Sequence, residues 1–265
     1  MSRGEFMLSL IERRSEIVRQ TESKGKVGVE ELARMLNVSQ VTIRNDLNAL
    51  NSKGLVVRAR GGAVASNRLT RELSLQERHK DNLSVKRRLG RAVADLIGNE
   101  VRTIALDSGT TTEEVALCLL DHRDLTVVTN GLNVAAALAR ARHIEILVTG
   151  GILRTRSLSF FGKHAEDGLR HIHFDKLVLG ADGIDTGVGV TSHFAQEASL
   201  SRRMCNMASE IILVADSSKF GRRCSHIICR FDRIDTLVTD AGIPRDIVRQ
   251  LAHEGVNLHI VDETD

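Results

Sequence analysis

Seven short apolar runs dominate the sequence from residue 103 onward, and they alternate with segments whose apolar residues recur at helical spacing. Strands buried on both faces need such continuous apolar runs, and helices are the usual crossover connections between parallel strands. The pattern therefore predicts an α/β domain built on a mostly parallel sheet. Its expected strands are 103–106, 125–128, 144–148, 176–179, 211–215, 236–238 and 257–261.

The first 65 residues follow a different pattern, that of three short helices and a hairpin. An apolar stripe over residues 10–18 predicts a helix that stops at Gly25, and a second amphipathic helix opens at Val29. A third helix is expected from Gln40 to about Lys53, followed at once by a strand over residues 55–58 and a Gly-Gly turn. This order predicts a winged helix-turn-helix.

The third helix is the predicted DNA-recognition helix. Ser39 is a suitable N-cap, although Thr42 stands where a full capping box has Glu or Gln, and Ile43, Leu47 and Leu50 share the side expected to be buried. The other side is polar, and Gln, Asn and Arg are the side chains that contact base edges in the major groove, while wing arginines suit phosphates. The predicted DNA-binding residues are Ser39, Gln40, Thr42, Arg44, Asn45, Asn48, Lys53, Arg58 and Arg60.

The charge distribution agrees with this assignment. Residues 1–80 carry 15 Lys and Arg against 9 Asp and Glu, which gives +6, whereas the remaining residues carry 22 against 25, which gives −3. Concentrated positive charge favours binding to a phosphate backbone. The chain has no Trp or Tyr, so platforms for stacking single-stranded nucleic acid are hard to build. Double-stranded DNA is therefore the expected nucleic-acid partner.

A polar, charged stretch without a long apolar stripe separates the two patterns. We accordingly expect a DNA-binding domain over residues 1–65, a linker over 66–86 and an effector domain over 87–265. No apolar run is long enough to span a bilayer and the N-terminal stretch is too charged for a signal peptide, so a cytoplasmic protein without a membrane partner is expected.

The cysteines and histidines of the sequence do not indicate a metal site or a redox site. The four cysteines match no zinc or redox spacing, and no carboxylate or cysteine completes a metal set with the nearby histidines. We therefore expect no metal site and no cofactor. The residues considered are Cys118, Cys205, Cys224, Cys229, His164, His171 and His173.

Polar clusters follow five of the predicted strands. In open α/β sheets ligands bind beyond the carboxyl ends of the strands, so the clusters are candidates for one convergent pocket. They contain the predicted effector-binding residues Asp107, Ser108, Gly109, Thr110, Thr111, Thr112, Thr129, Asn130, Gly150, Gly151, Asp182 and Lys219, to which Glu197 at the start of a predicted helix is added.

The Ser-Gly-Thr-Thr-Thr turn after the first strand suits an anion. Its glycine lets the backbone approach a phosphate, its hydroxyls donate hydrogen bonds, and the following helix presents free N–H groups. The alternative is that Thr110 or Thr111 merely caps that helix, with Glu113 or Glu114 completing a capping box. Lys219 and the carboxylates likewise have ordinary surface or helix-start alternatives.

Motifs along nearly the whole chain resemble the DeoR-type bacterial repressors, and more closely their AgaR-like subgroup of amino-sugar and hexitol regulators. In the first domain the resemblance lies in V-S-Q-V-T-I-R-N-D-L and V-R-A-R-G-G-A, and in the second in D-S-G-T-T, F-D-K-L-V-L-G-A-D-G-I-D and A-D-S-S-K-F-G. It implies a sensor similar in fold to ribose-5-phosphate isomerase, effector binding at the Thr-rich turn, and a homo-oligomer, dimer or tetramer.

Three functions compete at this point. The first is a repressor of a carbohydrate catabolic operon, not an enzyme, that a phosphorylated sugar or amino sugar releases from its operator. The second is a sugar-phosphate isomerase with an appended nucleic-acid module, in which Glu197 acts as the base; the T-G-V-G-V-T stretch after residue 185 departs from the isomerases' catalytic loop. The third, an RNA-binding or architectural protein, leaves the polar clusters unexplained.

Overall fold

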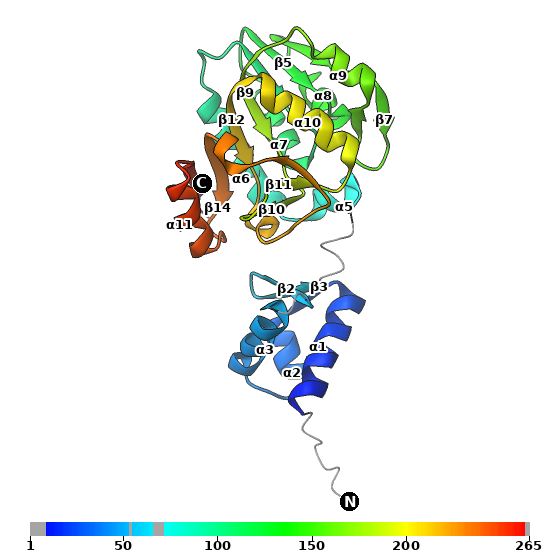
Figure 1. Cartoon of the computed structure of the whole chain (residues 1–265), viewed down its shortest axis with the longest axis vertical. Coiled ribbons are helices and arrows are strands. Elements are labelled where there is room, and N and C mark those ends of the chain that lie inside the picture. The colour runs from blue at the N-terminus through cyan, green and yellow to red at the C-terminus, as the bar shows by residue number, and fades with distance from the viewer. Residues whose placement is uncertain (1–8, 53–54, 66–71, 263–265) are drawn as a thin grey trace, which may run out of the picture. The chain divides into compact units, whose positions relative to one another are not determined.

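The computed structural model describes residues 9–52, 55–65 and 72–262, and it divides the chain into two compact units at Glu72 and Leu73 (Figure 1). The first unit, which we call the head, contains α1 (Leu10–Lys24), β1 (Lys26–Gly28), α2 (Val29–Met35), α3 (Gln40–Ser52), β2 (Val56–Ala59) and β3 (Gly62–Ala65). The second unit is called the sensor below.

The head has the predicted winged helix-turn-helix arrangement. Gly25 ends α1 in the left-handed conformation, and Ser39 Oγ accepts the Thr42 amide hydrogen at 3.0 Å, as expected for the N-cap of α3. The structure adds β1, which pairs antiparallel with β3 and is too short to show a periodic pattern. In α1 only part of the predicted stripe is buried, because Leu10 and Ile11 are 52% and 75% exposed.

Seven strands of the sensor form one parallel sheet, as the apolar runs predict. The strands are β4 (Thr103–Leu106), β5 (Leu125–Thr129), β6 (Ile144–Val148), β9 (Phe174–Leu179), β12 (Ala208–Val214), β14 (Thr236–Asp240) and β15 (Asn257–Val261). Their order is β15-β14-β12-β9-β4-β5-β6. The strand order reverses between β4 and β9, and such a switch point is where open α/β sheets bind ligands.

Buried apolar side chains cover both faces of this sheet. Leu177 and Leu179 of β9 belong to one core and Val178 to the other, as alternation along a strand requires. The first core includes residues of α9 (Lys163–Gly168), α10 (Ala195–Met207) and α11 (Arg245–His253), and α10 crosses in front of the sheet in Figure 1. The second includes residues of α6 (Leu83–Ile97), α7 (Thr110–Cys118) and α8 (Leu132–Leu138).

Two smaller β elements lie outside the large sheet. The hairpin of β7 (Ile152–Arg154) and β8 (Ser159–Phe161) is antiparallel, and β10 (Gly183–Asp185), β11 (Gly189–Ser192) and β13 (His226–Cys229) form a three-stranded antiparallel sheet. Backbone hydrogen bonds attach the hairpin to its surroundings, from Leu132 N to Leu158 O and from Leu75 N to Arg156 O.

The structure differs from the predicted linker over its second half. Residues 75–80 form α5 (Leu75–Lys80), α6 begins at Leu83, and both helices belong to the sensor. Helix α5 buries only Leu75 and so leaves no apolar stripe, while the buried face of α6 starts with the charged Lys86, so the apolar stripe of α6 does not mark where the helix begins. Gly90 lets α6 approach α7 closely, since a Cβ there would lie 2.7 Å from the Glu114 backbone. Lys86 is thereby brought to the ends of the central strands.

Candidate functional site

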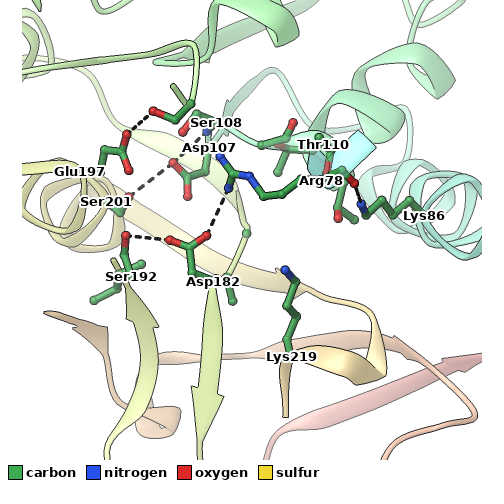
Figure 2. Close-up of a pocket in the computed structure, with 17 residues that line it drawn as sticks. Arg78, Lys86, Asp107, Ser108, Thr110, Asp182, Ser192, Glu197, Ser201 and Lys219 are labelled. Atoms are coloured by element: carbon green, nitrogen blue, oxygen red, sulfur yellow. Dashed lines mark hydrogen bonds and ion pairs between the residues drawn. The ribbon is translucent and has the colours of Figure 1, made fainter. Parts of the chain in front are cut away.

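The carboxyl ends of β4 and β9 open into a cavity at the switch point of the sheet. It measures about 610 Å³, counting the part open to solvent. The turn after β4, the start of α7, the turn after β9, α10 and the loop after β12 all contribute to its lining. The lining includes the cationic side chains of Arg78, Lys86 and Lys219 and the carboxylates of Asp107, Asp182 and Glu197 (Figure 2). The site is therefore charged, open to solvent, and lined by residues of the sensor alone.

The Ser-Gly-Thr-Thr-Thr turn forms one wall of the cavity. Gly109 is the N-cap of α7 with a φ of 147°, a conformation that favours glycine, and no side chain caps the helix. The capping-box alternative for Thr110 and Thr111 is therefore not formed. Thr112 Oγ1 donates to the Gly109 carbonyl at 3.1 Å. The first amides of α7 lack intrahelical partners, as at every helix start, so this wall can bind an anion.

Three cations come from separate elements. Arg78 lies on α5, Lys86 on α6 and Lys219 in the short 3₁₀ helix after β12. Burial, together with the positive charge of Lys219, lowers the pKa of Lys86 to about 8. Burial also lowers the pKa of Lys219, which nearby Asp216 partly offsets. Both shifts signal ammonium groups that would gain from an anionic ligand.

The carboxylates are held by hydrogen bonds and arginines. Asp182 Oδ1 lies 3.2 Å from Arg78 Nη1, and its Oδ2 accepts from Ser192 Oγ at 3.1 Å and the His193 amide at 3.2 Å. Burial would raise the pKa of Asp182, but the charges of Arg78 and Lys219 outweigh burial and lower it.

The other two carboxylates differ from Asp182 in their partners. Glu197 Oε1 accepts from Ser157 Oγ at 2.5 Å and lies 3.4 Å from Arg154 Nη1. Asp107 accepts from the Ser108 amide at 2.9 Å but pairs with no cation in the described part of the chain. Burial raises the pKa of Asp107 to about 7, against the effect of that hydrogen bond. Sugar hydroxyls and amines are the donors that such carboxylates accept.

The structure brings together nine of the thirteen residues predicted for the effector site. These are Asp107, Ser108, Gly109, Thr110, Thr111, Thr112, Asp182, Glu197 and Lys219.

The remaining four do not line the cavity, because β5 and β6 lie on one side of the switch point. Thr129 is buried and accepts the Gly131 amide hydrogen, and Asn130 is fully buried with its carbonyl bonded to the Phe160 amide. The Asn130 side-chain amide has no hydrogen-bond partner within residues that the structure describes. Gly150 and Gly151 lie between β6 and β7, where a Cβ on Gly151 would meet the Phe161 carbonyl.

Several lining residues escape the sequence patterns. Arg78 and Lys86 fall in the predicted linker, and the polar residues Ser157, Ser192 and Ser201 lie within or beside segments without any site motif. The signal that could have found Lys86 is its helical spacing with Leu89, Gly90 and Val93, which places it on the buried face of α6. Nothing local marks Arg78.

No group of three or more His, Cys, Asp or Glu that could hold a metal ion occurs in the described ranges 9–52, 55–65 and 72–262. Within the same ranges no helix is long and apolar enough to cross a membrane. The residues that line the cavity offer hydrogen-bond donors, acceptors and charges, which suit noncovalent binding of a ligand that carries both an anion and hydroxyls.

The second candidate site is the exposed face of α3. Ile43, Leu47 and Leu50 are buried as predicted. Arg44 Nη2 donates to Gln40 Oε1 at 3.1 Å, so two of the predicted base-contacting side chains lie together. The predicted residues that are exposed in this region are Ser39, Gln40, Arg44, Asn45 and Asn48, whereas Thr42 is half-buried.

The wing, which is the hairpin of β2 and β3, contributes Arg58 and Arg60. Arg58 Nη1 donates to the Gly62 carbonyl at 3.0 Å, and burial together with the charge of Arg44 lowers the Arg58 pKa. The positive charges of Arg44 and Arg58 therefore act on one another. Arg60 is exposed. Lys53, which the sequence also assigns to DNA binding, lies outside the described residues.

A buried ion-pair cluster fixes α3 against α1. Asp46, 2% exposed, accepts from Arg13 Nε at 2.6 Å and from Arg14 Nε at 2.8 Å. Asp46 follows Asn45 directly but points to the opposite side of the helix from Arg44 and Asn48, which are exposed. The cluster thus holds the helix whose other face carries the predicted DNA contacts.

Comparison with protein families identifies both units. The DeoR-like helix-turn-helix domain matches residues 13–68, and the DeoR C terminal sensor domain matches residues 81–241. The second match covers more than half of the chain and contains the strands that line the cavity.

Two curated relatives match almost the entire chain. The "Putative aga operon transcriptional repressor" of Escherichia coli O157:H7 is 45% identical over 95% of this chain and 94% of its own. The glycerol-3-phosphate regulon repressor of Escherichia coli K12 is 32% identical over 94% of this chain and 98% of its own. Both are named as transcriptional regulators, not enzymes.

Among solved structures, ribose 5-phosphate isomerase A from Neisseria gonorrhoeae aligns with a TM-score of 0.39 and 13% identity, covering 52% of this chain and 53% of that one. The likeness is partial, whereas the family matches and the relatives span both units. The chain therefore belongs to the DeoR family of transcriptional regulators.

Proposed function

We propose that this protein represses a carbohydrate catabolic operon and leaves its operator when a phosphorylated sugar or amino sugar binds in the sensor. The cavity carries this proposal, because it combines the free start of α7 and three cations with three carboxylates. Phosphate suits the first set of groups, and hydroxyl or amino groups suit the second. The glycerol-3-phosphate regulon repressor, a relative, bears the name of a phosphorylated polyol.

The proposed effector-binding residues are the nine predicted residues that line the cavity, joined by Arg78 and Lys86. Phosphate is expected near Lys86, Lys219 and the amides of Thr110 and Thr111, and the rest of the ligand near Asp182 and Glu197. The proposed DNA-binding residues are those of α3 and the wing. Operator DNA lies with the bacterial chromosome, so the protein is proposed to act in the cytoplasm.

A screen of ligands tests the sensor. Thermal unfolding of the full chain is followed with phosphorylated and unphosphorylated sugars, amino sugars and hexitols. A ligand at about 100 times its dissociation constant stabilises by roughly 2.7 kcal/mol, so an effector raises the melting temperature clearly. The same ligand must then release a fluorescent operator fragment. No stabilisation by any phosphorylated member of the panel would refute the proposed effector class.

A variant separates effector binding from DNA binding. Lys219→Ala combined with Thr110→Ala is expected to bind the operator as wild type does but to be insensitive to the effector. Lys163→Ala provides a matched control, since Lys163 is an exposed lysine on α9 paired with Asp167. Full induction of the double variant would show that the effector binds elsewhere.

We also propose that the protein is a homo-oligomer, because helix-turn-helix proteins that bind as dimers match two half-sites. The edge strand β6 and the adjoining β7 expose apolar side chains that suit a second copy, namely Leu147, Val148, Ile152 and Leu153. Light scattering measures the mass in solution. A monomer at micromolar concentration with operator present would contradict this proposal.

A further inference from the structure

Helix α5 is attached to the rest of the sensor by the buried Leu75, by His79, which lies 3.0 Å from Glu113, and by Arg78, which alone of the three lines the cavity. In sequence α5 is the first described element after the head, and its Arg78 reaches Asp182 in the turn after β9, 3.2 Å away (Figure 2). Lys86 of α6 donates to the Arg78 carbonyl, which ties the end of α5 to α6. Two of the three cavity cations therefore act on α5.

Arg78 is only partly satisfied in this position. Its Nε is buried and has no hydrogen-bond partner anywhere in residues 9–52, 55–65 and 72–262. A guanidinium forms two parallel hydrogen bonds with a phosphate, and such charge-assisted pairs are stronger than a single contact with a carboxylate. A phosphate bound between Lys86 and Lys219 would therefore compete with Asp182 for Arg78.

If a phosphate took Arg78 away, Asp182 would lose its ion-pair partner. Its Oδ2 keeps the hydrogen bonds from Ser192 and His193, but within the described part of the chain Oδ1 accepts from Arg78 alone. A carboxylate in a buried site that loses its ion pair is costly unless another donor replaces it. A hydroxyl group of the same ligand supplies such a donor.

We propose that Arg78 exchanges partners: it binds Asp182 in this structure and binds the effector's phosphate in the complex, where a hydroxyl of the effector replaces it on Asp182. This inference rests on the proposed function, whose effector it restricts to monophosphates of polyhydroxy compounds. Inorganic phosphate satisfies Arg78 but leaves Asp182 unpaired. An unphosphorylated sugar satisfies neither the cations nor Arg78.

The exchange also changes how α5 is attached to the rest of the sensor. Arg78 is the only side chain of α5 that pairs with a strand-end carboxylate among the recorded contacts of the described residues, so its release frees α5 from the turn after β9. Effector binding thus loosens α5 at Arg78, while Leu75 and the contact between His79 and Glu113 keep its other attachments to the sensor. This local loosening of the helix that follows the head in sequence is the change that weakens operator binding.

Titration with inorganic phosphate tests the exchange without knowledge of the effector. Phosphate binding is measured by calorimetry for wild type, Asp182→Asn, Arg78→Gln and the double variant. Asp182→Asn leaves Arg78 unheld, so its phosphate affinity is expected to rise by about tenfold. The gain is expected to disappear in the double variant, because Arg78 is then absent.

Asp216→Asn provides the matched control for general electrostatics. Asp216 is a buried carboxylate close to Lys219 and Lys86, but it accepts from Asn82 and the Ser218 amide and makes no pair with Arg78. Its replacement is expected to raise phosphate affinity only a few-fold. Equal gains in Asp182→Asn and Asp216→Asn, or a gain that survives in the double variant, would overturn the exchange, as would an Asp182→Asn variant that binds no phosphate at millimolar concentration.

Hydrogen exchange of the α5 amides is the second measurement. Saturating phosphate is expected to speed exchange in residues 75–81 of wild type, while Asp182→Asn exchanges quickly with or without phosphate. Unchanged exchange in α5 on saturation overturns the proposed loosening of α5. If phosphorylated sugars still release operator DNA in that case, the proposed function stands without this inference; if none releases it, the proposed function itself fails.

Discussion

The head and the sensor use buried carboxylates in opposite ways. In the head, Asp46 is held by Arg13 and Arg14 at 2.6 and 2.8 Å and its only evident role is to fasten α1 to α3. In the sensor, Asp182 pairs with a single arginine, Arg78, whose Nη1 lies 3.2 Å from Asp182 Oδ1, and both residues line the open cavity. The two arginines that bind Asp46 join two helices, whereas the single arginine that binds Asp182 lies in a cavity where a ligand could take its place. The head therefore works as a rigid scaffold and the sensor as a site that changes partners.

Asp46→Asn tests the scaffold role and should have the largest effect. It leaves two partly buried arginines without their counter-ion, so the head should lose about 2–4 kcal/mol, somewhat less than the roughly 3–5 kcal/mol of fully buried pairs. Thermal unfolding should show an early transition of the head and an unchanged one of the sensor. Asp182→Asn, the matched change in the sensor, should leave the unfolding transition of the head unchanged. If the two substitutions lowered the unfolding free energy of their units equally, the head and the sensor would not differ in how they use buried carboxylates.

Arg44→Ala should come next in magnitude and act on DNA alone. A side chain that contacts a base edge contributes about 1–3 kcal/mol, so operator affinity should fall roughly tenfold or more. Fluorescence anisotropy on operator variants measures it, with thermal shift by the effector as a check that the sensor is intact. Arg19→Ala removes an exposed arginine of α1, paired with Glu16, and should change little. If Arg44→Ala binds every operator variant as tightly as wild type does, Arg44 does not contact the operator.

The pH should affect the two units differently. Lys86, with its pKa lowered to about 8, loses its charge above that pH, and Asp107, with its pKa raised to about 7, gains a negative charge above pH 7. Both changes disfavour an anion, so effector affinity should be highest near pH 6.5 and fall by up to about tenfold per pH unit above pH 8.

The predicted DNA contacts of the head include no histidine or carboxylate, so operator affinity without effector should stay nearly constant. Calorimetry for the effector and anisotropy for DNA, in the same buffers, compare the two directly. An effector affinity that is flat between pH 6.5 and 9 would show that Lys86 does not contact the phosphate.

Arg60→Ala should have the smallest effect. A wing arginine that contacts a phosphate contributes through counterion release, so its loss should reduce the salt dependence of binding by about one unit of slope while preserving sequence preference. Operator affinity measured across a series of salt concentrations gives that slope. A changed preference among operator variants, with the slope unaltered, would instead assign Arg60 to base contacts.

The sequence predicts the head more completely than the sensor site. Helix starts and stops such as Ser39 and Gly25 act through their nearest neighbours, so the patterns that reveal them are local. The strands of the sensor are equally visible, since each buried run stands out from its surroundings. The strand β1 and the helix α5 were not predicted, because three residues or one buried side chain leave no periodic signal.

What the sequence by itself determined is most of the elements, namely a winged helix-turn-helix and seven strands in one parallel sheet, together with the position of the turn from Asp107 to Thr112 after the first of these strands. What only the tertiary structure decided is which of the polar clusters meet. The strand order places β4 beside β9, so the turns after these two strands share the cavity, while those after β5 and β6 do not line it. Arg78 and Lys86 reach the cavity only because α5 and α6 pack there. Strand order and helix packing arise from contacts between residues far apart in the chain, which no local pattern records.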